Sequence, residues 1–143
     1  MRYLFLSIIF VSFLFSSNLR RDANLKVVID NKNNLMWVDD VTNLKLRLSH
    51  EKATEYCKEL SHAGYSNWRL PDIEEYALIV DKKNEINYIN KAFRFNLPDG
   101  YWASKAHWRT FWFYADYMYF VSGTPYYDSR HKNKLFRCVR SMK

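Results

Sequence analysis

A basic C-terminal segment, residues 130–143, has the residue types that most directly indicate a chemistry. It contains six Lys or Arg and no Asp or Glu. Such side chains bind sulfate and carboxylate groups through charge-assisted hydrogen bonds, which arginine can make in bidentate pairs. Surface aromatic residues can also stack on sugar rings. The candidate ligand-binding residues are therefore Arg130, Lys132, Lys134, Arg137, Arg140, Trp108, Tyr126 and Tyr127. The alternative is that the segment is a solvated face and the aromatic residues belong to the core.

No residue pattern predicts catalysis or metal binding. The four histidines are far apart and lack the spacing of metal ligands. Glu74 and Glu75 are adjacent in a predicted helix, where neighbouring residues do not face one another, and acidic residues favour a first helical turn for electrostatic reasons. We find no Ser-His-Asp or Cys-His pattern. We therefore expect a protein that is not an enzyme and needs no cofactor.

The N-terminus predicts export. A basic residue is followed by an apolar run from Leu4 to Phe15 and then by small polar residues, which is the order of a secretory signal. The apolar run is shorter than the ~20 residues that span a bilayer. We expect a signal peptide at 1–17, an extension at 18–25 and one domain at 26–143, with an uncleaved N-terminal anchor as the alternative. After cleavage no integral membrane span is expected.

Net charge and compartment together limit the class of partner. The formal net charge is +7, and removing residues 1–17 leaves about +6. Nucleic acid is the usual partner of a basic domain, but the expected export makes it a poor candidate, so no nucleic-acid partner is expected. An acidic polysaccharide, anionic lipid headgroups or an acidic envelope protein fits better. The oligomeric state does not follow from the sequence.

The two cysteines, Cys57 and Cys138, are expected to form a disulfide in an oxidising compartment. Closing a loop of this length stabilises a domain by roughly 4 kcal/mol in chain-entropy estimates. The alternative is two free thiols, or one reactive thiol.

The N-terminal half of the predicted domain consists of a hairpin and a helix. Residues 26–30 and 35–38 read as two strands joined by an Asn-rich turn, at one edge of a sheet. Residues 39–48 are expected to form a loop. Ser49 is a candidate N-cap for a helix over 50–62, whose apolar stripe carries Cys57 inward.

A corner follows at 68–72. Asp72 and Glu75 have the spacing of a capping box for a second helix, and Pro71 keeps the preceding residue extended. Alternation in this extended segment places Trp68 and Leu70 on one face. Arg69 points the other way, and we expect it to bind a loop carbonyl or an acidic residue.

The C-terminal half is rich in aromatic residues, with 12 of the 27 residues in 101–127 being Phe, Trp or Tyr. Because such residues favour strands, we expect strands at 101–104, 111–115 and 118–121, with a turn at 123–125. Residues 135–140 alternate, so Arg137 should share a face with Leu135 and Val139.

Four segments in order resemble one known family: "VVIDNKNNLMW" at 27–37, "ATEYCKELSHAGYSNWRLPDIEEY" at 53–76, "YWAS" at 101–104 and "FRCVR" at 136–140. They are similar to the Lcl C-terminal domain family, named for a collagen-like adhesin of Legionella. The chain departs from the family pattern at Asn34 and Ala103, where the family has Gly and Ser. The residues that carry the motifs structurally are Trp37, Trp68, Arg69, Leu70, Pro71, Asp72, Glu75 and Trp102.

The resemblance implies an α+β, C-type-lectin-like fold. In this fold two helices flank a twisted antiparallel sheet, and one disulfide joins the first helix to the last strand. The motifs with which calcium-dependent sugar binders of this fold hold the metal are absent from the sequence, so no calcium site is expected. The named adhesin binds sulfated polysaccharides, which gives a class of ligand.

Two functions from different classes remain open. The first is an exported, non-enzymatic binding domain of the cell envelope that recognises acidic or sulfated polysaccharide through a basic C-terminal face. The second is a structural or adaptor subunit of a periplasmic or outer-membrane assembly. The aromatic content favours the second function, because Tyr, Trp and Arg anchor protein interfaces.

Overall fold

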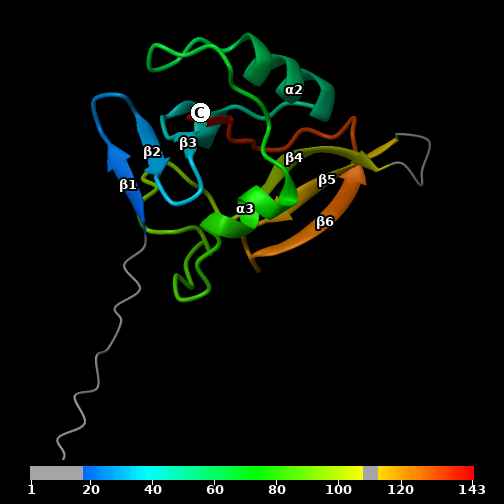
Figure 1. The fold of residues 1–143 in the computed structure, drawn as a ribbon. Coiled ribbons are helices and arrows are strands. Elements are labelled where there is room, and N and C mark those ends of the chain that lie inside the picture. The colour runs from blue at the N-terminus through cyan, green and yellow to red at the C-terminus, as the bar shows by residue number, and fades with distance from the viewer. Residues whose placement is uncertain (1–17, 108–112) are drawn as a thin grey trace, which may run out of the picture.

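A computed structural model describes residues 18–107 and 113–143 and places their strands in two antiparallel sheets (Figure 1). The first sheet has the order β1-β2-β3-β7 and the second the order β4-β5-β6. The strands are β1 Leu19–Asp22, β2 Val27–Asp30, β3 Leu35–Val38, β4 Gly100–His107, β5 Tyr114–Tyr119, β6 Thr124–Ser129 and β7 Val139–Ser141. The helices are α1 Thr42–Lys45, α2 His50–Glu59 and α3 Ile73–Ile79. The mixed helix and sheet class is as predicted, but two sheets replace the predicted single one.

The predicted hairpin is present as β2 and β3, with Asp30 paired to Leu35 across its turn. The carboxylate of Asp30 accepts hydrogen bonds from the backbone and side-chain nitrogens of Asn33, and Asn34 has a φ of 55°. These are the properties for which turns select Asn and Asp. Its predicted place at a sheet edge is wrong, because β1 pairs with β2 and β7 pairs with β3. The N-terminal extension thus supplies the edge strand.

The corner at 68–72 has the predicted arrangement. Trp68 and Leu70 are buried at 3% and 2% exposure, while the side chain of Arg69 points to solvent. Asp72 accepts a hydrogen bond from the backbone N–H of Glu75, and the carboxylate of Glu75 accepts one from the backbone N–H of Asp72. The capping box is therefore confirmed.

Arg69 binds an acidic residue, as expected. Its guanidinium donates to both carboxylate oxygens of Glu75, at 2.8 and 2.6 Å. The Arg69 backbone pairs in both directions with that of Val139, so the corner is also fixed against the last strand.

The disulfide between Cys57 and Cys138 is present and ties α2 to the residue before β7. Helix α2 ends at Glu59, one turn earlier than predicted, and residues 42–45 form the short helix α1 within the predicted loop. The segment 135–138 is buried but lies outside any strand except for isolated bridges, so the predicted strand over 135–140 is reduced to β7.

The second sheet differs most from the prediction. Strand β5 runs through Asp116 without a break, so the two predicted strands at 111–115 and 118–121 are one strand as far as the described residues show. Strand β6 begins at Thr124, inside the predicted turn, and was not predicted. Gly123, with a φ of 68°, lies in the turn itself.

Two clusters of buried residues form the core. In the first, the rings of Trp37, Tyr76, Tyr101 and Phe120 pack mostly edge to face, with centroids 5.2 to 6.5 Å apart. The second surrounds the disulfide and contains Trp68, Trp102 and Phe136. Among the described residues, no helix is both long and apolar enough to cross a membrane.

Candidate ligand-binding surface

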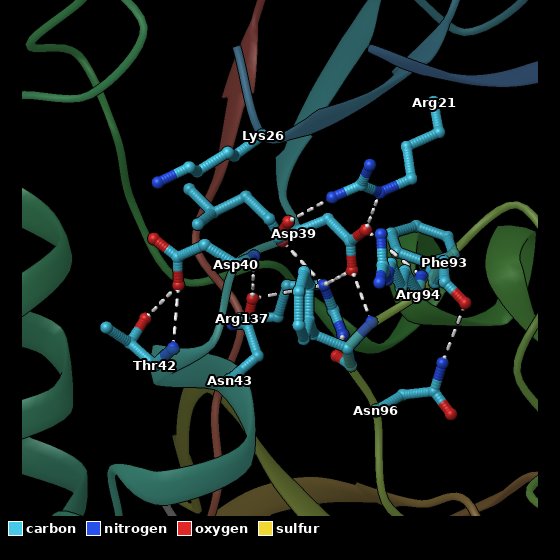
Figure 2. A network of polar contacts seen from close by, with 12 residues as sticks. Arg21, Lys26, Asp39, Asp40, Thr42, Asn43, Phe93, Arg94, Asn96 and Arg137 are labelled. Carbon is cyan, nitrogen blue, oxygen red and sulfur yellow. Dashed lines mark hydrogen bonds and ion pairs between the residues drawn. The ribbon is translucent and has the colours of Figure 1, made fainter. Parts of the chain in front are cut away.

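Arg137, predicted to face a ligand, has no exposed surface at all. One terminal nitrogen of its guanidinium donates to the backbone oxygen of Val38 and to Oδ1 of Asp39, and the other donates to the backbone oxygen of Phe95 (Figure 2). A buried charge requires such a partner because desolvation is costly. Arg137 is therefore removed from the predicted surface.

Asp39 is the centre of this buried network, and both of its oxygens are saturated. Oδ1 accepts from Arg137 and from the backbone N–H of Phe95, while Oδ2 accepts from Arg21 and from the backbone N–H of Arg94. These donors come from β1, the loop before β4 and the segment before β7 (Figure 2). The network holds four distant parts of the chain together, which is a structural role.

Arg140 is also largely withdrawn from solvent, with 7% exposure. Its Nε donates to Oδ1 of Asn67 at 2.7 Å, and its guanidinium lies 3.8 Å from the ring centroid of Tyr65. This arrangement satisfies the side chain within the protein. The basic C-terminal face expected from the sequence is accordingly smaller than predicted.

Lys132 and Lys134 share one acidic residue, Asp128. Their ammonium nitrogens lie 2.9 and 2.8 Å from its two carboxylate oxygens. Burial would raise the pKa of Asp128, but the hydrogen bonds from both lysines outweigh that effect and lower the pKa to about 2. One positive charge therefore remains in excess at this group. Lys132 is the more accessible lysine, with 64% of its side chain exposed against 15% for Lys134.

A group of tyrosine rings lies beside these lysines. The rings of Tyr117, Tyr119 and Tyr126 contact one another with centroids 6.0 to 6.3 Å apart. The ammonium of Lys134 lies 4.1 Å from the ring centroid of Tyr117. Tyr126 is 51% exposed, so its ring is open to solvent. We call the set Tyr117, Tyr119, Tyr126, Lys132 and Lys134, with Asp128, the tyrosine–lysine surface.

The local structure explains how these side chains meet. Tyr117 pairs with Tyr126 across β5 and β6, and Tyr119 is two residues further along β5, so all three rings project from one face. Gly100 leaves room for the group, because an added Cβ would lie 2.9 Å from the ring of Tyr117. The lysines reach this face from the segment that follows β6.

Tyr127, the other predicted tyrosine, lies on the opposite face of the sheet because consecutive strand residues alternate. It is 58% exposed and stacks on the ring of His107 with centroids 4.6 Å apart. The sheet therefore separates two tyrosines that are adjacent in the sequence. Of these two tyrosines, only Tyr126 belongs to the tyrosine–lysine surface.

The two remaining candidates are Trp108 and Arg130. Trp108 lies outside the described residues. Arg130 is partly exposed, and its backbone is fixed by hydrogen bonds to Phe113 and His50. Sequence reasoning missed Tyr117, Tyr119 and Asp128. The alternation of tyrosines along β5 was an available signal, but placing a strand break near Asp116 concealed it.

His50 and the tyrosine–lysine surface differ in their access to solvent. His50 is buried, with Nε2 2.9 Å from the backbone oxygen of Ala103, and burial lowers its pKa. Within residues 18–107 and 113–143, no group of three His, Cys, Asp or Glu side chains is placed to hold a metal ion. What the tyrosine–lysine surface offers is the exposed ring of Tyr126 for stacking and the exposed side chain of Lys132.

Comparison with protein families gives a match over most of the chain. The model of the Lcl C-terminal domain family matches residues 26–140, which include all elements from β2 to β6 and most of β7. No curated protein matches the chain. The matched region contains the disulfide, the corner at 68–72 and the tyrosine–lysine surface. The chain belongs to the Lcl C-terminal domain family.

Proposed function

We propose that the protein is an exported, non-enzymatic binding domain of the cell envelope, and that it recognises acidic polysaccharide through the tyrosine–lysine surface. The observation that carries this proposal is the position of the exposed Tyr126 ring beside two lysines that share a single carboxylate. A sugar ring can stack on the tyrosine while its sulfate or carboxylate group meets the excess positive charge.

Further support comes from the family and from the disulfide. Membership of the Lcl C-terminal domain family favours an adhesin-like binding role. A disulfide that encloses most of the domain is typical of proteins of oxidising compartments, which favours export. The C-type-lectin-like relationship implied by the resemblance stays part of this proposal.

A second function, as an adaptor subunit of an envelope assembly, is favoured by the opposite face of the second sheet. Tyr127 is 58% exposed there, and Tyr114, 37% exposed, packs edge to face on it. Exposed aromatic residues of this kind anchor protein interfaces. The two functions use opposite faces of the sheet, so substitutions can separate them.

The test measures retention of the purified protein on immobilised heparin and on a neutral polysaccharide across a salt series. Tyr126→Ala and Tyr127→Ala form a matched pair, because the residues are adjacent and similarly exposed but face opposite ways. We expect Tyr126→Ala and Lys132→Gln to elute from heparin at lower salt than the wild type, and Tyr127→Ala to elute unchanged.

Other outcomes would change the conclusion. Absence of retention on heparin would reject polysaccharide recognition and favour the adaptor function. That function would then be tested by cross-linking in the native envelope, where Tyr127→Ala should lose a partner that Tyr126→Ala keeps.

A further inference from the structure

Three cations from separate segments line a hollow of about 210 Å³ away from the tyrosine–lysine surface. They are Arg21 of β1, Lys26 of the turn after β1, and Arg94 of the loop before β4 (Figure 2). Ala23, Val41 and Phe95 complete the lining. The sequence does not predict this group from a run of basic residues, because the three side chains come from separate segments that meet only in the folded chain.

The acid that binds Arg21 is already saturated. Asp39 is fully buried and binds Arg21 and Arg137 as well as two backbone N–H groups. Within the described residues, neither Arg94 nor Lys26 forms an ion pair, although Figure 2 shows Asp40 on the same side as Lys26. The hollow therefore carries uncompensated positive charge.

The rest of the lining is apolar. The guanidinium carbons of Arg21 and Arg94 lie 5.6 and 5.5 Å from the ring centroid of Phe95. Stacking on this ring limits the orientations of the two guanidinium groups. Val41 adds an apolar wall that is 45% exposed. Cations beside apolar walls favour an oxyanion attached to an organic ring over a bare inorganic ion.

We infer that this hollow is a second binding site, which takes the carboxylate or sulfate group of an acidic sugar. Arg94 is the principal ligand, because it is exposed and, among the described residues, its guanidinium has only the Phe95 ring as a partner. Arg21 is held by Asp39 through Nε and one terminal nitrogen, and Lys26 also lines the hollow. The class of ligand rests on the proposed function, but the location does not.

The experiment uses the protein purified from cells that express the full chain. Two probes, sodium glucuronate and a heparin-derived tetrasaccharide, are titrated and followed by ¹⁵N-resolved NMR. The backbone N–H groups of Arg94 and Phe95 donate to Asp39 directly beneath the hollow, so their signals report on binding there. We expect both probes to shift these signals.

Substitutions then test which residues bind. Arg94→Gln combined with Lys26→Gln should raise the Kd for the tetrasaccharide about tenfold, since each removes a charge-assisted contact. Lys91→Gln, an exposed lysine in the same loop outside the hollow, is the matched control with the same change in charge per site. Thermal unfolding should be unchanged in both variants, because the Arg94 backbone keeps its bond to Asp39.

The outcomes separate this inference from the proposed function. If the double variant binds the tetrasaccharide as tightly as Lys91→Gln does, while Tyr126→Ala weakens binding, the second site is wrong and the proposed function stands. If the double variant weakens binding and Tyr126→Ala does not, the hollow is the site and the tyrosine–lysine surface is not. Absence of shifts with both probes overturns the inference outright.

Discussion

Two carboxylates of this domain each bind two cations, and their settings are opposite. Asp39 lies in the buried network that supports the first sheet, with none of its side chain exposed, and it binds two arginines. Asp128 lies at the edge of the second sheet with 21% of its side chain exposed, and it binds two lysines. Each cluster thus has one negative and two positive charges, but the Asp39 cluster stabilises the fold and the Asp128 cluster forms part of a surface.

The difference arises from the donors. Asp39 also accepts two backbone N–H groups from a loop distant in the sequence, so the chain itself fixes the carboxylate. Asp128 accepts the backbone N–H of its neighbour Ser129, and the lysines reach it through flexible side chains. A buried charge that loses its partner stays desolvated, while an exposed one returns to water. The degree of burial therefore decides how much each ion cluster contributes to the free energy of unfolding.

The largest expected effect follows from removing the charge at the buried cluster. Asp39→Asn leaves Arg137 as a buried charge without its partner, and we expect a loss of about 3–5 kcal/mol in the free energy of unfolding. Chemical denaturation measures this loss, with Asp128→Asn as the matched control. A loss below about 1 kcal/mol would show that the buried network does not support the fold as argued.

The disulfide is a second feature whose removal should strongly lower the stability of the domain. Cys57→Ser with Cys138→Ser removes a cross-link that joins α2 to the residue before β7. We expect a loss of roughly 4 kcal/mol, because the cross-link restricts the unfolded chain over a long loop. Unfolding of the wild type with and without reductant checks the same quantity, and equal midpoints would contradict the prediction.

A smaller effect is expected at the corner, where the ion pair between Arg69 and Glu75 is partly exposed. Glu75→Gln should cost roughly 1 kcal/mol, whereas the adjacent exposed Glu74 should tolerate Gln within about 0.5 kcal/mol. Arg69→Ala gives a second test. If it left stability unchanged but abolished ligand binding, the corner would be a binding site.

The corner also predicts a dependence on pH. Burial raises the pKa of Glu75, but the hydrogen bonds from Arg69 and from the Asp72 backbone, together with the charge of Arg69, outweigh this effect, and the net pKa lies below its ordinary value of 4.5. A lowered pKa in the folded state means that the stabilisation is complete above pH 4.5 and is lost as the pH falls through the folded value. Acid unfolding of Glu75→Gln should therefore show a shallower loss below pH 4.5.

The sequence predicted those features whose partners are close along the chain. The capping box of Asp72 and Glu75 and the burial of Trp68 and Leu70 follow from spacings of two or three residues, and the structure confirms them. The disulfide was also predicted, because only one pairing of two cysteines exists.

The positions of the cations required the three-dimensional structure. Arg137 lies 98 residues from Asp39, and no local pattern distinguishes an arginine that will bind a buried acid from one that faces solvent. Lys132 and Lys134 were identified, but the acid that they share was not, since β6 itself was unpredicted. The hollow of Arg21 and Arg94 was missed for the same reason.

The smallest effect on stability, and the most informative about binding, is expected at the exposed cluster. Asp128→Asn should change the free energy of unfolding by no more than about 1 kcal/mol, because the lysines that it releases are free to hydrate. It should also strengthen retention on heparin, since Lys132 and Lys134 would no longer be held by a carboxylate. The wild-type pKa of about 2 means that this carboxylate stays charged at pH 4, so acidification to that value cannot mimic the substitution.

Stronger retention with unchanged stability would establish that Asp128 restrains a binding surface. Weaker retention would instead show that Asp128 positions the two lysines for the ligand, and loss of stability comparable to that of Asp39→Asn would mean that the two clusters do not differ as their burial implies.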